Sequence, residues 1–255
     1  MTATFAPRIL TKPFAAGDTF ESLIEGHAAV CFRKLIPPAE IEKMIKGFYA
    51  AKEVWSEGFG GQQYALGDAW YHYAEEGIDF EEYGSKAEQS RANVEKFVPG
   101  LEGNLLGFLS PLARPGTLSI REGWAGPGFM MFPAGGFVAN KGGSIHFDTD
   151  AFSDEELYET DLVMFSLICM IQKPERGGNL TVWNKPFDKT QERFQSYNPA
   201  TQGAAESYHI EYQPGDLWMI RGMNAHQIGA FEGKTDRICL TFHVYKEGDD
   251  WFMWF

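Results

Sequence analysis

Residues 144–150 read S-I-H-F-D-T-D, and every second position in this stretch holds Ser, His or Asp. Side chains alternate between the two faces of a β-strand, so His146, Asp148 and Asp150 are predicted to share one face. A face buried in a core would carry Val or Ile instead. The stretch therefore predicts a strand whose polar face either meets water or binds a ligand.

Short strand-like segments continue from about residue 115 to the end of the chain. Runs of hydrophobic and aromatic residues end at turn signals such as Gly177-Gly178 and Pro214-Gly215. Regularly spaced short strands are typical of a sandwich or barrel. The predicted strands are residues 129–132, 144–147, 162–171, 179–183, 208–212, 216–220 and 237–245, with a further strand opened by His226.

Two of these strands, 162–171 and 237–245, are hydrophobic on both faces and need cover on both. Helices before residue 114 can provide it. Pro37-Pro38-Ala39-Glu40 opens a helix, and a hydrophobic stripe with helical spacing follows: Ile41, Met44, Ile45, Phe48 and Tyr49. A second helical region covers about 85–110, with a break at Pro99-Gly100.

The expected architecture is mainly β with flanking helices (α+β). Its core is a double-stranded β-helix of the jelly-roll or cupin-like type, with the N-terminal helices packed outside. With no internal repeat, residues 1–255 are expected to form one domain, helical over about 1–114 and β over about 115–255. Residues 56–84, rich in Gly, Tyr, Trp and Asp, fit either a substrate-covering loop or an irregular surface loop.

The formal net charge of −13 argues against nucleic acid and against an anionic membrane surface as partners. The longest hydrophobic run, 162–171, is half the length of a membrane span, and the first 20 residues lack a signal-peptide pattern. Three scattered cysteines fit a reducing compartment. We therefore expect a cytoplasmic protein with a small-molecule substrate.

Histidines and carboxylates suggest one particular metal site. His146 and Asp148 are spaced to lie on one strand face, and His226 opens a later strand that a sandwich could bring close. Two histidines and one carboxylate form the facial triad that suits Fe(II) oxygen chemistry, because three coordination positions stay open. The remaining histidines, at positions 27, 72, 209 and 243, are interpreted as ordinary core or surface residues.

Arg237 follows His226 at the start of the last long strand, and the segment between them resembles a hairpin turn. The hairpin would bring Arg237 beside the strand of His226. An arginine that faces into a barrel needs an anion, and a dicarboxylate cosubstrate would supply one. If Arg237 points inward, Cys239, Thr241 and His243 do the same by alternation, and Ile238, Leu240, Phe242 and Val244 point outward.

H-F-D at 146–148, G-G-N-L-T-V-W at 177–183, P-G-D-L-W-M-I at 214–220, His226 and Arg237 together resemble the Fe(II)/2-oxoglutarate-dependent dioxygenase superfamily. The resemblance covers about residues 115–245. The order of elements is also similar to the carrier-independent group that contains radical halogenases of free small molecules and their hydroxylating relatives.

The resemblance implies that His146, Asp148 and His226 hold Fe(II), and that Arg237 pairs with the distal carboxylate of 2-oxoglutarate. Thr241 or Trp183 would add a contact to this cosubstrate. O2 would be consumed, and succinate and CO2 released. Halogenases of the family have Gly or Ala where this chain has Asp148, so the resemblance favours hydroxylation of a small molecule, such as a free amino acid, over halogenation; desaturation stays open.

Several alternatives remain at this point. Asp150 either is solvated or caps a turn, or it faces the site and pairs with a substrate ammonium group. The chain could be a non-catalytic cupin-type metal or small-molecule binding barrel, or an interaction module with a vestigial site. The aromatic tail W-F-M-W-F (251–255) could cap the pocket, pack on the helices or form a subunit contact in a homodimer.

Overall fold

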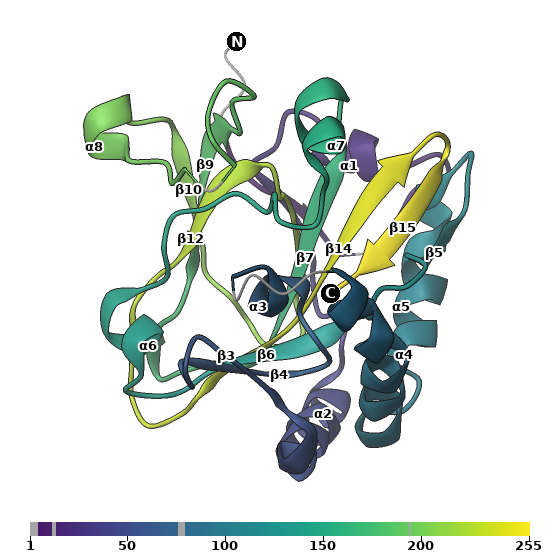
Figure 1. Cartoon of the computed structure of the whole chain (residues 1–255), viewed down its shortest axis with the longest axis vertical. Helices are drawn as coiled ribbons and strands as arrows, with labels where there is room; N and C mark the ends of the chain where they lie inside the picture. The colour runs from purple at the N-terminus through teal and green to yellow at the C-terminus, as the bar shows by residue number, and fades with distance from the viewer. Residues whose placement is uncertain (1–4, 12–13, 76–79, 194) are drawn as a thin grey trace.

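Two β-sheets of unequal size face each other in the computed structural model, which describes the chain except residues 1–4, 12–13, 76–79 and 194 (Figure 1). The large sheet has ten strands, mostly antiparallel, in the order β1-β2-β11-β7-β14-β6-β4-β3, with β15 beside β14 and β5 beside β15. Its strands are β1 (Arg8–Leu10), β2 (Ala29–Phe32), β3 (Ser56–Gly58), β4 (Gln63–Leu66), β5 (Leu118–Ile120), β6 (Gly128–Phe132), β7 (Met164–Gln172), β11 (Leu217–Arg221), β14 (Arg237–Glu247) and β15 (Asp250–Trp254).

The smaller sheet has the strand order β10-β9-β12, and a separate strand pair joins β8 to β13. Their bounds are β8 (Arg176–Gly177), β9 (Leu180–Pro186), β10 (Ser207–Ile210), β12 (Asn224–Ile228) and β13 (Phe231–Glu232). The fold is the mixed α and β architecture with a large antiparallel sheet that the strand pattern predicts.

Helices cover the outer face of the large sheet. In Figure 1, α2 (Pro38–Ala50), α4 (Phe80–Phe97) and α5 (Leu101–Leu109) lie on the side away from the small sheet. They share one hydrophobic core with the outward side chains of β14, namely Ile238, Leu240, Phe242 and Val244. The remaining helical segments are α1 (Phe20–Ile24), α3 (Trp70–Glu75), α6 (Phe137–Lys141), α7 (Asp154–Glu159), α8 (Pro199–Gln202) and the 3-10 turns η1 (Lys52–Val54) and η2 (Ser110–Ala113).

The helix expectations are confirmed in most details. α2 starts at Pro38 and buries Ile41 and Phe48, whereas Tyr49 at the edge of the stripe is 40% exposed. The break at Pro99-Gly100 separates α4 from α5, and Gly100 caps α5 with a left-handed backbone (φ 76°) that favours glycine. None of the helices in the described residues is both long and hydrophobic enough for a membrane crossing.

The expectation of a helical N-terminal part was incomplete. β1 to β4 all lie before residue 114 and join the large sheet, β2 against β11 and β4 against β6. These strands have only three or four residues, too few to show a clear alternating pattern. Residues 56–75 are accordingly not one irregular loop, because they contain the β3–β4 hairpin and α3.

Two further expectations need correction. Residues 144–147 do not form a regular strand: only His146 makes a β-bridge, to His226. The predicted hairpin between His226 and Arg237 is also wrong, because β12 belongs to the small sheet and β14 to the large one. The connection passes instead through β13, which pairs with β8, so His226 and Arg237 approach each other from opposite sheets.

The aromatic tail is part of the core. β15 pairs with β14 on one side and with β5 on the other. Trp251 and Met253 join the hydrophobic core under the helices, and Trp254 joins a second aromatic cluster near the small sheet. Trp251 and Met253 therefore agree with the interpretation that the tail packs on the helices.

Candidate metal centre

His146 and His226 lie directly opposite each other and point to the same side. Their backbones exchange two hydrogen bonds, N–H of each residue to C=O of the other, at 3.1 and 3.0 Å. Directly paired residues of antiparallel segments share one face, so the two imidazole rings lie 4.3 Å apart, centroid to centroid. A register shift in the β12–β9 pairing falls beside His226, a feature common near functional sites.

Backbone carbonyls set the tautomers of both rings. Nδ1 of His146 lies 3.0 Å from the carbonyl oxygen of Ser144, and Nδ1 of His226 lies 2.8 Å from that of Asn224. A carbonyl only accepts, so Nδ1 carries the proton in each neutral ring, and Nε2 keeps its lone pair. Both Nε2 atoms therefore face the centre in the form that binds a metal.

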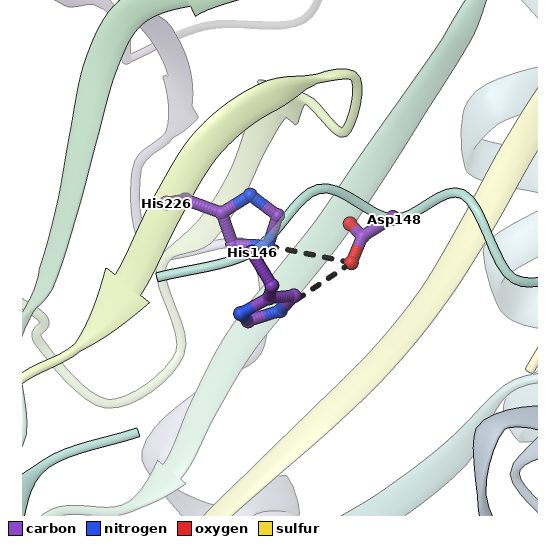
Figure 2. A group of neighbouring side chains, drawn as sticks. All are labelled: His146, Asp148 and His226. Atoms are coloured by element: carbon purple, nitrogen blue, oxygen red, sulfur yellow. Dashed lines mark ion pairs between the residues drawn. The ribbon is translucent and has the colours of Figure 1, made fainter. Parts of the chain in front are cut away.

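The Asp148 carboxylate completes a set of three converging ligand atoms (Figure 2). Its Oδ1 lies 3.3 Å from Nε2 of His226 and 3.6 Å from Nε2 of His146. Neighbouring ligands at about 2.1 Å from an octahedral metal are about 3 Å apart, so the two distances from Oδ1 to the histidines need only a small contraction. Two nitrogens and one oxygen on one side of the ion fit Fe(II), since the cavity side stays open.

The electrostatics favour this ligand set. Burial raises the pKa of Asp148, but the imidazoles of His226, His243 and His146 outweigh burial and hold it well below its usual range. Burial and the adjacent His226 lower the pKa of His146 to about 4. Burial also lowers the pKa of His226, yet the Asp148 carboxylate raises it above the ordinary value, so a proton and a metal ion compete for this ring.

Ser166 and His243 hold the second oxygen of Asp148. The Ser166 hydroxyl donates to Oδ2, and Nδ1 of His243 lies 3.1 Å from the same hydroxyl and 3.8 Å from Oδ2. β7, β14 and β15 place Ser166, His243 and Trp254 in register, and the Trp254 ring lies against the imidazole of His243. This support directs Oδ1 toward the two histidines and leaves Oδ2 engaged elsewhere.

Arg237 is buried in the same cavity, with only 1% of its surface exposed. Its Nε donates to the carbonyl of Gly178 at 3.0 Å, and its guanidinium lies over the rings of Phe132 and Tyr212. Gly178 has φ +69°, and a Cβ there would stand 3.3 Å from Cδ of Arg237, so glycine suits this close approach. No carboxylate of the described residues forms an ion pair with Arg237.

Tyr212 provides a second donor beside Arg237. Its hydroxyl is fully buried and has no hydrogen-bond partner in the described part of the chain. A buried hydroxyl without a hydrogen-bond partner and a buried guanidinium without a carboxylate partner among the described residues together fit a carboxylate group of a bound molecule. The cavity that both line has a volume of about 540 Å³ and extends to the three metal ligands, so the residues present fit 2-oxoglutarate.

The other predicted site residues have different positions. Thr241 lines the cavity, two residues beyond Cys239 on the inner face of β14. Trp183 does not line it within the described residues; its ring packs near Tyr197. Asp150 lines the cavity beside Asp148, and its backbone carbonyl accepts from the Trp70 indole at 2.7 Å.

Sequence reasoning missed three residues of this site: Ser166, Tyr212 and His243. The alternation that placed Arg237 and Thr241 inward also places His243 inward, so that signal was present. Ser166 and Tyr212 reach the site through the registers of other strands, and nothing in their local sequence marks them.

Comparisons with known proteins show the fold. No family model and no curated protein match the chain. A solved N-substituted L-amino acid dioxygenase from Burkholderia ambifaria AMMD is similar at a TM-score of 0.56 and 14% identity, covering 91% of this chain and 87% of that chain. Its complex with α-ketoglutarate gives 0.53 and 14%, covering 89% and 86%.

A third similar structure is the epimerase SnoN in complex with Fe3+, α-ketoglutarate and nogalamycin RO. Its TM-score is 0.50 at 12% identity, and the match covers 86% of this chain and 82% of that chain. The chain therefore has the fold of Fe/2-oxoglutarate dioxygenases, together with a candidate site of the H-x-D…H type.

Proposed function

We propose that the protein is an Fe(II)- and 2-oxoglutarate-dependent oxygenase that hydroxylates an unactivated C–H bond of a small molecule. One observation carries the proposal: a single cavity contains a two-histidine, one-carboxylate ligand set and a buried arginine without a carboxylate partner in the described residues. The ligand set suits the metal, and Arg237 with Tyr212 suits one carboxylate of the cosubstrate.

The bound iron and 2-oxoglutarate would supply the oxidation, in which one oxygen atom of O2 enters the product and the other enters succinate as CO2 leaves. The chain's own residues would hold and orient these groups. His146, Asp148 and His226 would bind the metal from one side, and Arg237 would fix the far end of the cosubstrate. Ser166 and His243 would keep the Asp148 carboxylate in place.

Asp148 favours hydroxylation over halogenation. In the halogenases that the sequence resembles, Gly or Ala stands at the corresponding position and leaves room for a halide. Here the carboxylate is present, ionised and hydrogen-bonded to Ser166. We therefore infer that the position that a halide would need is filled by Oδ1.

We further propose that the substrate is an amino acid or a related metabolite. Asp150 lines the cavity two residues from Asp148, where its carboxylate could meet a substrate ammonium group. The similar Burkholderia structure is described as an amino acid dioxygenase, which supports the same class. Replacing Asp150 by Asn is expected to raise KM for an amino acid substrate about tenfold. An unchanged KM would exclude this role of Asp150.

The first experiment is an anaerobic titration with Fe(II), followed by 2-oxoglutarate, monitored by the visible charge-transfer absorption of the chelate. His226→Ala is expected to remove the band through loss of iron, and Arg237→Ala to remove it through loss of cosubstrate. His209→Ala and Arg176→Ala serve as matched controls, because both residues lie outside the cavity. If iron binds but no band forms, the protein is a metal-binding barrel and not this oxygenase.

A further inference from the structure

Three aromatic residues of the cavity lining, Phe59, Tyr71 and Phe137, are partly exposed, and we call them the aromatic rim. Phe59 lies in the β3–β4 turn and Phe137 begins α6, and the two elements lie near each other in Figure 1. Phe59 remains 37% exposed and Phe137 57% exposed, although both line the cavity that contains the metal ligands. Exposed aromatic rings gathered around a cavity are typical of a surface that a ligand covers.

The backbone of the β3–β4 turn fixes Phe59 in an unusual conformation. Phe59 has φ +54°, which is rare for a residue with a side chain, and Gly60 and Gly61 continue the turn at φ +62° and +80°. The Phe59 ring is braced by the rings of Tyr71 at 6.5 Å and His72 at 5.9 Å. Strained residues of this kind persist where the surrounding structure holds them, commonly at ligand sites.

Gln63 adds one polar group to this uncharged wall. It is 5% exposed, it lines the cavity, and its amide lies 2.8 Å from Nε2 of His72. His72 packs against Gly58, where a Cβ would come within 2.4 Å of the imidazole. Burial lowers the pKa of His72 to about 4, so the ring is neutral near pH 7. A neutral, rigidly placed histidine therefore orients the Gln63 amide.

Charge is distributed unevenly around the cavity. The charged lining residues lie elsewhere, on the 148–150 segment, at Arg193 and at the start of β14. The cavity lining contributed by the β3–β4 hairpin, α3 and α6 contains only uncharged residues: Phe59, Gln62, Gln63, Tyr71, Phe137 and Val138. The volume of about 540 Å³ lies in the range of pockets for drug-sized ligands, so it suits a molecule larger than the cosubstrate alone.

From this distribution we infer that the substrate has a hydrophobic body, at least the size of a benzene ring, that lies on the aromatic rim, and a neutral hydrogen-bonding group that Gln63 recognises. This inference rests on the proposed function and narrows its substrate class. An amide both donates and accepts, so Gln63 matches an amide, ketone or hydroxyl group without selecting a charge. The charged end of the molecule faces Asp150 and Arg193.

Three probes with the same amino acid end test the inference by calorimetry on the full chain: L-norleucine, Nε-acetyl-L-lysine and Nε-benzoyl-L-lysine. The first has neither feature, the second has the amide and the third has the amide and a ring. The benzoyl compound is expected to bind at least tenfold more tightly than the acetyl compound. Equal affinities of these two compounds would contradict the inference that a substrate ring lies on the aromatic rim.

Variants test the aromatic rim and the Gln63 amide separately. Phe137→Ser is expected to remove the preference for the benzoyl compound and leave the acetyl compound unchanged. Gln63→Leu is expected to weaken both amide probes about tenfold relative to L-norleucine, and His72→Phe to weaken them less. Ile9→Ser is the control, because Ile9 is 42% exposed and lies outside the cavity. If Gln63→Leu affects all three probes equally, the amide role is excluded.

The charge-transfer band separates failure of this inference from failure of the proposed function. If the band forms but the benzoyl compound is not preferred, the oxygenase function stands and substrate binding on the aromatic rim is excluded. If the benzoyl compound is preferred but no band forms, binding on the aromatic rim stands and the oxygenase function is excluded. Thermal unfolding of each variant checks that a lost preference does not arise from a lost fold.

Discussion

The two faces of β14 differ completely in what their side chains do. On the outer face Ile238, Leu240, Phe242 and Val244 are fully buried under the helices. On the inner face Arg237, Cys239, Thr241 and His243 line the cavity. The outer face contains only hydrocarbon, whereas the inner face, which borders the cavity, contains a cation, a thiol, a hydroxyl and an imidazole. The outer face therefore stabilises the fold, and the inner face would serve the proposed chemistry at some expense in stability.

The largest effect is expected on the outer face. Leu240→Ala removes a fully buried side chain of β14, the strand between β6 and β7, and should lower the free energy of unfolding by about 2–5 kcal/mol. The affinity for 2-oxoglutarate should stay within twofold of the original. Denaturant unfolding and anaerobic titration measure the two quantities. A large loss of affinity in a folded variant would contradict the separation of the faces.

On the inner face, Arg237→Gln should have the opposite signature. Arg237 is the proposed charged partner of the cosubstrate, so its loss is expected to weaken 2-oxoglutarate binding by about 2–4 kcal/mol, or roughly 30- to 1,000-fold. The free energy of unfolding should be unchanged or higher, since a buried cation without an ion-pair partner in the described residues is removed. Arg176→Gln, at an exposed site, is the control. A destabilised variant with normal affinity would make Arg237 a structural residue.

Ser166→Ala tests whether the inner face positions the Asp148 carboxylate for a metal ion. Without the hydroxyl, Oδ2 of Asp148 loses its hydrogen bond and the carboxylate can rotate, so Fe(II) affinity should fall about 10- to 100-fold. The visible spectrum of the Co(II) form should also change, because a rotated carboxylate can bind through both oxygens. Ser207→Ala on β10 should alter neither measurement. An unchanged Co(II) spectrum would show that Ser166 does not position Asp148.

The smallest effect concerns His72, a buried polar residue of the cavity wall. Its pKa is lowered to about 4 in the folded chain, below the ordinary 6.5, so protonation favours the unfolded state. Stability should be complete above about pH 6.5 and should fall by about 1–2 kcal/mol as the pH drops to about 5. His72→Gln should flatten this part of the profile. If the stability of the original protein and of His72→Gln falls equally between about pH 6.5 and about pH 5, a group other than His72 causes the loss.

The local sequence predicted those parts of the fold that depend on a single element. The stripe from Ile41 to Phe48 gave the buried face of α2, and the alternation from Arg237 to Val244 gave both faces of β14. The strands β1 to β4 were not predicted, because three or four residues are too few to show the alternation of a β-strand. Their position is set by pairing with β11 and β6, which lie far along the chain.

The candidate site divides in the same way. The amino-acid sequence was enough to identify the candidate site residues, since H-x-D, a distant histidine and an inward-facing arginine are visible in the residues themselves. Only the tertiary structure decided that His146 faces His226 through a single β-bridge and that Arg237 approaches from the opposite sheet. It also decided that Ser166, His243 and Tyr212 stand beside them and that the β3–β4 hairpin forms a wall of the cavity. The physical reason is that periodicity records which face of an element is buried, whereas the partners across a cavity depend on how separate strands pack together.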